Sequence, residues 1–254
     1  MTDSTNPRVA IVGGGVAGLT AGTFCARNGF DTVVVNHGES ILRRNAHLEN
    51  LPGFPAGINS RTFLDLLETQ AGRNGCLFEE GRVRALTESD DEFVLRLEGE
   101  REESDLIADY VIAASWADTE YLEGLDGVGL TARGSKTYVD VDDYSRTGVD
   151  GVYAAGRIAE KPHQAVVAAG HGAEVALTLI DDSDVPFYHD WVAPEGYFTE
   201  RGRDVPPGIE EIDDDERRRR ERESMDAIVD AFEQPHPDEP TMHPSVVDAR
   251  NDDA

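Results

Sequence analysis

Lysine is nearly absent from this chain of 254 residues, which has only Lys136 and Lys161. The 23 basic residues, mostly arginines, face 51 carboxylates, and the formal net charge is −28. Such a surface repels polyanions, so we expect neither nucleic acid nor an anionic membrane as a partner. Excess carboxylate with little lysine suits a surface that stays hydrated in concentrated salt, where repulsion is screened within about 3 Å. We therefore expect a halophilic cytoplasmic protein; the alternative is an ordinary acidic protein.

Cysteine is also scarce, with Cys25 and Cys76 far apart in the chain. No Cys-x-x-Cys pair and no metal-ligand cluster occurs, so the sequence indicates neither a redox dithiol nor a metal site. Cys25 falls within a predicted helix, where small apolar packing is the simplest role. No apolar run approaches membrane-spanning length, and the polar N-terminus does not predict a signal peptide.

Residues 9–36 contain the pattern around which we expect the chain to fold. An apolar run, a glycine cluster at 13–18, a helical stretch and a second apolar run follow one another, as in a dinucleotide-binding βαβ unit. Gly13 permits the tight turn, Gly15 lets backbone N–H groups approach a pyrophosphate, and Gly18 lets the helix pack close to the sheet. The positive end of the helix dipole would then face the phosphates.

The following part of the chain predicts more strands and helices of the same α/β domain. The first predicted elements are a proline- and glycine-rich loop at 37–60, a helix at 61–74, and a small antiparallel meander at 77–79, 82–86, 92–97 and 102–107. The next are a buried parallel strand at 109–115, strands at 132–141 and 148–156, and a helix at 164–180. Gly170 and Gly172 lie inside the last helix, where they indicate either a close approach or ordinary helix–sheet packing.

After residue 181 the composition changes, and we expect a C-terminal extension over 182–233. Its aromatic and proline-rich first part should lie across the domain surface, with its aromatic side chains docking into grooves. Residues 213–232 predict an amphipathic helix capped by Asp213. The four consecutive arginines of this helix have carboxylates four positions before them, which favours an internally paired, solvated face over a nucleic-acid site. The apolar stripe of the helix should be buried on the body or on a second subunit, and residues 234–254 should be poorly ordered.

Five separated stretches then occur in a fixed order: GGGVAG at 13–18, ENLPGFPAGI at 49–58, DYVIAAS at 109–115, GVDGVYAAGR at 148–157 and HQAVVAAGHGAEVAL at 163–177. Together they resemble the FAD domain of thioredoxin-reductase-like (pyridine nucleotide-disulfide) flavoprotein oxidoreductases. The resemblance covers roughly residues 8–181, and we therefore expect a Rossmann-like FAD-binding domain over 1–181.

The resemblance implies that an FAD molecule lies extended across the sheet. Its pyrophosphate would lie at the glycine turn, its ribose near the end of the second strand, its adenine beside the meander, and its flavin near the start of the last helix. The implied cofactor-binding residues are Gly13, Gly15, Val16, Ala17, Gly18, Asn36, Asn50, Val83, Ala114, Ser115, Gly156, Arg157, His163, Gln164 and Ala165.

The departures from this family concern both the chain length and single residues. The family inserts its NADPH domain, with the redox cysteine pair, between the strands that correspond to DYVIAAS at 109–115 and GVYAAG at 151–156; here only 35 residues, 116–150, separate them and contain no G-x-G-x-x-G. We therefore expect no nicotinamide site and no dithiol relay. Asn36 replaces an acid, Arg157 replaces an aspartate, and SILRR at 40–44 replaces a Gly-Gly-Gln run.

These patterns leave several functions open. The leading hypothesis is a single-domain FAD oxidoreductase that takes electrons from a protein donor such as ferredoxin or from a small substrate. The alternatives are a non-catalytic nucleotide-binding or interaction protein on the same fold, and a crevice that holds NAD. No catalytic residue is evident; His163 and His171 are the best candidates for proton transfer, although a structural role is simpler. Arg43 and Arg44 could receive an anionic substrate, but a solvated role is favoured, and a homodimer is plausible.

Overall fold

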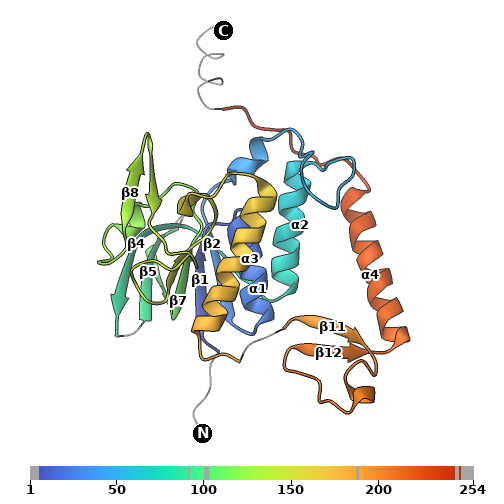
Figure 1. The fold of residues 1–254 in the computed structure, drawn as a ribbon. Coiled ribbons are helices and arrows are strands. Elements are labelled where there is room, and N and C mark those ends of the chain that lie inside the picture. The colour runs from blue at the N-terminus through green and yellow to red at the C-terminus, as the bar shows by residue number, and fades with distance from the viewer. Residues whose placement is uncertain (1–5, 91, 100–102, 187–188, 244–245, 247–254) are drawn as a thin grey trace.

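The computed structural model describes residues 6–90, 92–99, 103–186, 189–243 and 246. Its centre is a parallel sheet of five strands in the order β10-β7-β1-β2-β3, which confirms the predicted α/β class (Figure 1). The strands of this sheet are β1 (Arg8–Val12), β2 (Asp31–Asn36), β3 (Leu77–Glu80), β7 (Tyr110–Ala113) and β10 (Val152–Ala154). The helices of this part are α1 (Val16–Arg27), α2 (Ser60–Arg73) and α3 (Ala165–Asp182), with 3-10 turns η1 (Ile41–Arg44), η2 (Glu120–Leu122) and η3 (Gly156–Ala159).

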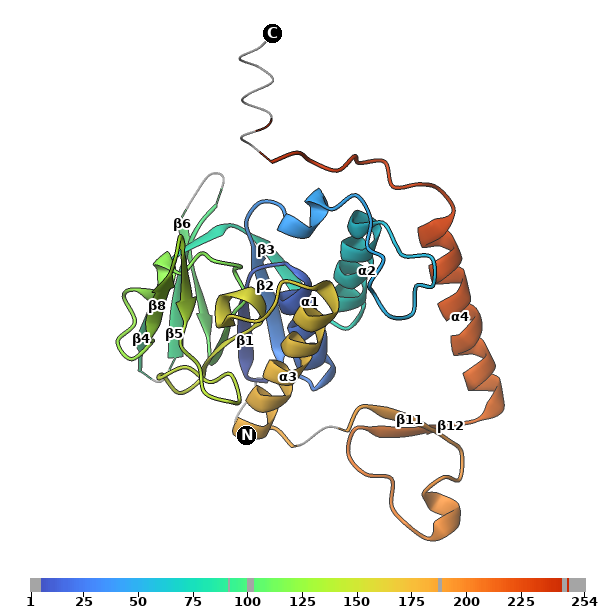
Figure 2. The ribbon, with the colours of Figure 1, turned by 45° about the horizontal axis from the view of Figure 1, so that its top comes forward.

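Both faces of the parallel sheet are covered, which explains why its central strands are apolar at nearly every position. Along β1, Val9 and Ile11 belong to the core against the helices, and Ala10 and Val12 belong to the core on the opposite face. Figure 2 shows α1, α2 and α3 on one side of the sheet and the antiparallel strands on the other. The carboxyl ends of β1, β2, β7 and β10 therefore meet along one edge, where α/β folds bind ligands.

The antiparallel layer differs in one respect from the expected meander. Strands β4 (Arg82–Ser89), β5 (Glu92–Glu98) and β6 (Glu103–Ala108) form it, as predicted. The first predicted run, however, is β3, which pairs in parallel with β2 at the edge of the main sheet. Periodicity cannot decide between these arrangements, because a four-residue run has too few positions to show which sheet it joins. The strand expected at 132–141 is a hairpin of β8 (Leu130–Arg133) and β9 (Lys136–Val139).

The first half of the C-terminal extension forms a small unit of its own. Strands β11 (Trp191–Pro194) and β12 (Ile209–Ile212) pair in parallel and are joined through the 3-10 turn η4 (Thr199–Arg201). The rings of Trp191, Tyr197 and Phe198 stack edge-on against one another at centroid distances of 4.8–5.6 Å. The expectation that these aromatic side chains dock into grooves of the domain is therefore wrong; they pack within their own unit, which stands apart from the main sheet (Figure 1).

Helix α4 (Asp214–Phe232) begins where the sequence predicts, and the Asp213 carboxylate accepts a hydrogen bond from the Glu216 N–H at 2.8 Å. Its arginines pair within the helix, for example Arg218 with Asp214 at 3.1 Å and Arg220 with Glu216 at 2.7 Å. The apolar stripe is not buried on the body, contrary to one expectation, since its members are 46–67% exposed: Met225, Ile228, Val229 and Phe232. Burial of this stripe against a second subunit stays a prediction.

The segment after α4 was expected to be poorly ordered, yet residues 234–243 have defined contacts. His236 lies 2.9 Å from Asp65 on α2, and Asp238 lies 3.9 Å from Arg43 on η1. Composition could not show this, because the contacts join residues more than 170 positions apart in the chain. The remainder of the predicted tail, apart from Val246, lies outside the described residues. In the described part, no helix is long and apolar enough to cross a membrane.

Candidate functional site

The glycine turn between β1 and α1 is shaped by two close backbone approaches. Gly13 has a φ of +120°, and a Cβ there would lie 2.5 Å from the Ala114 carbonyl oxygen. A Cβ on Gly18 would lie 2.0 Å from the Gly13 oxygen. At Gly15 a Cβ would meet only the Ser40 hydroxyl, at an ordinary 3.7 Å, so the protein itself does not require glycine there. The missing side chain instead keeps the N-terminus of α1 open toward the cavity beside it.

A cavity of about 610 Å³ lies at the carboxyl edge of the parallel sheet. This volume is within the range of about 300–1,000 Å³ typical of ligand sites. Its walls come from the glycine turn, the end of β2, the η1 segment, the start of β4, the loop after β7, and the start of α3. These segments are far apart in the sequence, and the parallel sheet brings their ends together.

Most of the residues implied by the sequence line this cavity. They are Gly13, Gly15, Val16, Ala17, Asn36, Val83, Ala114, Ser115, Arg157, His163, Gln164 and Ala165. Gly18, Asn50 and Gly156 do not line it. Gly18 permits the α1 packing described above, and the Asn50 amide donates to the Gln164 side chain at 2.7 Å, joining the loop after η1 to the start of α3. Gly156 positions the residue that follows it.

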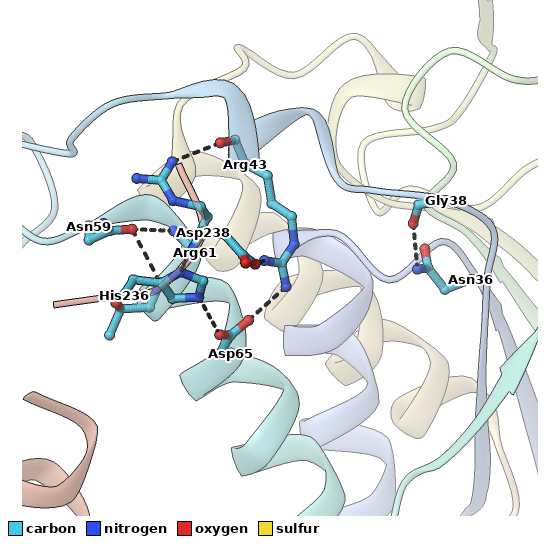
Figure 3. Close-up of polar contacts among 9 residues, drawn as sticks. Asn36, Gly38, Arg43, Asn59, Arg61, Asp65, His236 and Asp238 are labelled. Atoms are coloured by element: carbon cyan, nitrogen blue, oxygen red, sulfur yellow. Dashed lines mark hydrogen bonds and ion pairs between the residues drawn. The ribbon is translucent and has the colours of Figure 1, made fainter. Parts of the chain in front are cut away.

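The Asn36 side chain connects the end of β2 to the glycine turn. Its Oδ1 accepts a hydrogen bond from the Gly14 N–H at 3.0 Å. Its Nδ2 donates to the Gly38 carbonyl at 3.0 Å, as Figure 3 shows. An acid at this position could make the first of these bonds but not the second, because an ionised carboxylate has no donor. The Asn36 oxygen and amide are therefore both already hydrogen-bonded to backbone groups of the protein.

The cavity has a different charge balance from the molecule as a whole. It is lined by Arg44, Arg82 and Arg157 but by only two carboxylates, Glu39 and Asp118, in a chain whose net charge is −28. Arg82 is neutralised locally, since it lies 3.0 Å from Asp118 and 3.2 Å from Glu120. The remaining arginines favour an anionic ligand.

Arg157 follows Gly156 at the end of β10, and its guanidinium binds neutral oxygens. It donates to the Tyr138 hydroxyl at 2.5 Å and to the Lys161 carbonyl at 3.3 Å, and it lies 5.0 Å from the centre of the Tyr138 ring. Its Nε is buried and has no hydrogen-bond partner among the described residues. A buried donor left without an acceptor is costly, but an atom enclosed by protein is not open to the cavity, so this N–H does not itself indicate a ligand.

His171 does not line the cavity but is hydrogen-bonded to the turn at Gly156. Its Nδ1 accepts the Gly156 N–H at 2.8 Å, so Nε2 carries the proton and donates to the Ser145 hydroxyl at 2.7 Å. Burial, helped by the charge of Lys161, lowers the pKa of His171 to about 4. The residue is 4% exposed, stays neutral near pH 7 and does not line the cavity. His171 is thus structural, and the suggestion that it could transfer protons in the site is wrong.

The sequence reasoning missed Trp116, which lines the cavity directly after Ser115. Its φ of +61° is unusual for a bulky side chain. The ring lies edge-on to His163 with centroids 6.1 Å apart, and the Lys136 ammonium is 5.4 Å from its centre. Trp116 and His163 therefore bring the loop after β7 and the start of α3 together beside the cavity. A tryptophan in a loop carries no periodic signal that could have identified it.

The wall formed by the η1 segment is fixed by α2. Arg61, which is 3% exposed, donates to the Arg43 and Asn45 carbonyls at 2.9 Å each. The Arg43 guanidinium binds Asp65 at 2.7 Å, and His236 binds the other oxygen of the same carboxylate (Figure 3). Arg43 is thus paired rather than solvated, contrary to expectation, whereas Arg44 is exposed on the cavity wall.

Neither cysteine lies at the cavity. Cys25 and Cys76 are buried in the core between the sheet and the helices, which confirms packing as the role of Cys25. Burial raises the pKa of both thiols, that of Cys76 to about 11, so neither forms a thiolate near pH 7. Among the described residues, no group of three or more His, Cys, Asp or Glu side chains could hold a metal ion.

Two family models match the chain. The model described as an FAD binding domain matches residues 8–47, and the one described as pyridine nucleotide-disulphide oxidoreductase matches residues 67–172. Between them they cover the glycine turn, the end of β2 and most of the other cavity walls. The chain carries the FAD domain of the thioredoxin-reductase-like oxidoreductases. Both models indicate FAD as the cofactor of this domain.

Curated relatives match the FAD domain over part of their own length. A thioredoxin reductase of Schizosaccharomyces pombe is 34% identical over 125 residues, which is 46% of this chain and 39% of that protein. A dihydrolipoyl dehydrogenase of Bacillus subtilis is 30% identical over 176 residues, or 68% of this chain and 34% of that protein. The chain thus matches well under half the length of either relative.

Solved structures share the fold at lower identity. A thioredoxin reductase from Gloeobacter violaceus aligns with a TM-score of 0.58 and 18% identity, covering 73% of this chain and 99% of that chain. The thioredoxin reductase of T. acidophilum aligns with a TM-score of 0.60 and 18% identity, covering 70% and 99%. At this identity the likeness concerns the fold alone.

The residues of the cavity fit FAD. The open backbone at Gly15 and the uncapped N-terminus of α1 suit a pyrophosphate, since helix N-termini bind phosphate groups. The positive charge of Arg157, which lines the cavity, suits an anionic ligand. The start of α3 likewise has no side-chain cap, so its N–H groups are free to face a ring oxygen.

Proposed function

We propose that this chain is a single-domain FAD-dependent oxidoreductase without its own NADPH site or dithiol. Its electrons come from a protein donor such as ferredoxin, or from a small substrate that reaches the flavin end of the cavity. The single observation that carries the proposal is the structure of residues 116–150, which join β7 to β10 at the position where the family places its nicotinamide domain. They form η2 and the β8–β9 hairpin.

Bound FAD would supply the electron chemistry, because flavins exchange both hydride and single electrons. The protein's own contribution is binding and orientation. The N-terminus of α1 and the glycine turn hold the pyrophosphate, and Arg157 adds positive charge beside them. The Ala165 N–H, at the positive end of the α3 dipole, would stabilise negative charge on the reduced ring, whereas the Gln164 N–H already donates to the Pro162 carbonyl at 2.9 Å.

Proton transfer in this proposal has one candidate residue. His163 lines the cavity beside Gln164, and its ring contacts Trp116, so its orientation is defined. An imidazole can both donate and accept a proton, which is what general acid–base catalysis requires of a side chain. This proton-transfer role of His163 is part of the proposal. The electron donor, the oligomeric state and a cytoplasmic location are parts of the proposal as well.

One observation favours a second candidate, a nucleotide-binding or interaction protein without catalysis. Asn36 uses both its carbonyl and its amide within the protein, so its contact with a cofactor ribose would be weaker than that of a free acid. In that case the exposed helix α4 would recruit the partner.

The test is anaerobic reduction of the FAD-loaded protein in concentrated salt. We expect dithionite and reduced ferredoxin to bleach the visible flavin bands, and NADPH or NADH to leave them unchanged over the same interval. Bleaching by NAD(P)H at catalytic rates would contradict the missing nicotinamide site. A flavin that dithionite reduces but that passes no electrons to or from any protein or small substrate would support the second candidate.

A further inference from the structure

Arg157 differs from the two other arginines that line the cavity, Arg82 and Arg44. Arg82 is paired with two carboxylates, and Arg44 is exposed to solvent. Arg157 is half-buried, and its partners are a hydroxyl, a carbonyl and the face of a ring. It therefore lines the cavity as a cation that no carboxylate of the described residues neutralises.

The position of Arg157 is fixed from both sides. Gly156 has a φ of +78°, and a Cβ there would lie 2.8 Å from the Ala17 Cβ on the first turn of α1. On the opposite side, the Gly156 N–H is held by His171. The residue that follows this turn therefore starts next to the N-terminus of α1, where the backbone is open toward the cavity.

An uncompensated, preorganised cation has a physical cost in the empty protein. Charge that is partly removed from water is unfavourable unless it is paired. An anion that binds beside the Arg157 guanidinium relieves this penalty. The overall charge of −28 repels an anionic cofactor from outside, so a local cation matters more here than in a neutral protein.

We propose that Arg157 is a cofactor-binding residue whose guanidinium pairs with the pyrophosphate of FAD. This inference rests on the proposed FAD site and adds a direct charge contact to it. The helix N-terminus alone offers only partial charge, whereas the guanidinium carries a full charge in a fork that suits phosphate oxygens. The contact therefore acts on the phosphates and not on the flavin ring.

The experiment measures binding of FAD and of ADP to the apoprotein in concentrated salt, by fluorescence and by calorimetry. ADP has the diphosphate and the adenosine but no flavin. We expect Arg157→Gln to weaken both ligands by a similar factor of about tenfold or more, since hydrogen bonds to charged groups typically contribute this much. Arg84→Gln is the matched control, because that arginine lies outside the cavity, pairs with Glu98 and changes the net charge by the same amount, and it should change either affinity less than about threefold.

Two further measurements separate this role from a purely structural one. The thermal midpoint of the Arg157→Gln apoprotein reports the loss of the contacts with Tyr138 and Lys161, so it measures any structural role separately from ligand affinity. Arg157→Lys, which keeps the charge, should recover most of the ADP affinity. This variant also provides the test if Arg157→Gln does not fold.

Several outcomes would overturn the inference. Unchanged FAD and ADP affinity in Arg157→Gln would do so, and so would a loss for FAD with none for ADP, which would move the contact to the flavin. A lower thermal midpoint with unchanged ADP affinity would leave only a structural role. If the unaltered chain binds neither ligand, the proposed function fails together with this inference.

Discussion

Gly170 and Gly172 are two positions apart on α3 and have different surroundings. A Cβ on Gly172 would lie 2.2 Å from the Ala17 carbonyl oxygen on α1, whereas a Cβ on Gly170 would meet nothing within 4 Å. Of the two explanations that the sequence left open, close approach holds for Gly172, and its neighbour is a helix backbone.

These surroundings predict opposite effects for the same substitution. Gly172→Ala should destabilise the protein by about 1–3 kcal/mol or more, because α3 must move away from α1. Gly170→Ala should stabilise it by about 0.5–1 kcal/mol, because alanine restricts the unfolded chain and suits a helix. Thermal or denaturant unfolding of both variants checks this pair, and equal effects would show that α1 and α3 do not approach as described.

His171 predicts a specific loss of stability in mild acid. Its pKa is about 4 in the folded protein and about 6.5 in an unfolded chain, so the unfolded state binds more protons between these values. The free energy of unfolding should therefore be fully retained above about pH 6.5. Through this group it should fall by about 2 kcal/mol between pH 7 and pH 5.

The matched variant for this test is His171→Asn, whose side-chain oxygen can still accept the Gly156 N–H but does not titrate. Unfolding of both proteins is followed between pH 7 and pH 5 at constant salt. The carboxylates titrate in both, so the difference between the two curves isolates the histidine. Parallel curves would mean that His171 is not buried in the neutral form.

At the scale of elements, the C-terminal extension contacts the domain at few points. Phe232 lies 6.4 Å from Phe54, Arg73 pairs with Glu223 at 3.7 Å, and Arg27 pairs with Asp190. Helix α4 has no buried residue, so its stability depends on capping and on exposed ion pairs, which are typically weak.

We therefore expect the backbone amides of α4 to exchange with deuterium much faster than those of α1. Both helices form hydrogen bonds along their length, but α1 is packed against the sheet and α3. Hydrogen–deuterium exchange with mass spectrometry compares the two in one sample. Slow exchange in α4 at high protein concentration but not on dilution would instead indicate that a second copy covers its apolar stripe.

The elements differ in how far the sequence predicted them. The strands β1, β7 and β10 and the turn at Gly13 were predictable, because buried parallel strands are apolar throughout and the turn requires glycine at fixed positions. The pairing of β3, the contact of His236 with Asp65 and the place of Trp116 were not. Each of these depends on which distant segments meet, and local periodicity contains no such information.

At the scale of the whole molecule, charge decides the conditions for stability. The net charge of −28 produces self-repulsion, which salt screens over a Debye length of about 10 Å at 0.1 M and 3 Å at 1 M. Ion pairs such as those along α4 weaken in the same salt, but exposed pairs contribute little. The relief of charge repulsion by salt should therefore outweigh the weakening of the ion pairs, so that salt stabilises the folded protein.

We expect the thermal midpoint to rise steadily as potassium chloride is raised from 0.1 M toward several molar. Circular dichroism at each concentration measures it, with sucrose at matched water activity as the control for preferential hydration. A midpoint that stays level or falls with salt would contradict the halophilic interpretation.

The cavity at the edge of the parallel sheet is the centre of the account, since every functional residue discussed lies on it or supports it. The most direct measurement is the visible absorbance spectrum of the protein purified in concentrated salt, followed by titration of any apoprotein with FAD. The account predicts flavin bands on isolation, or a saturable uptake of about one FAD per chain. A colourless protein that takes up no added FAD would contradict it.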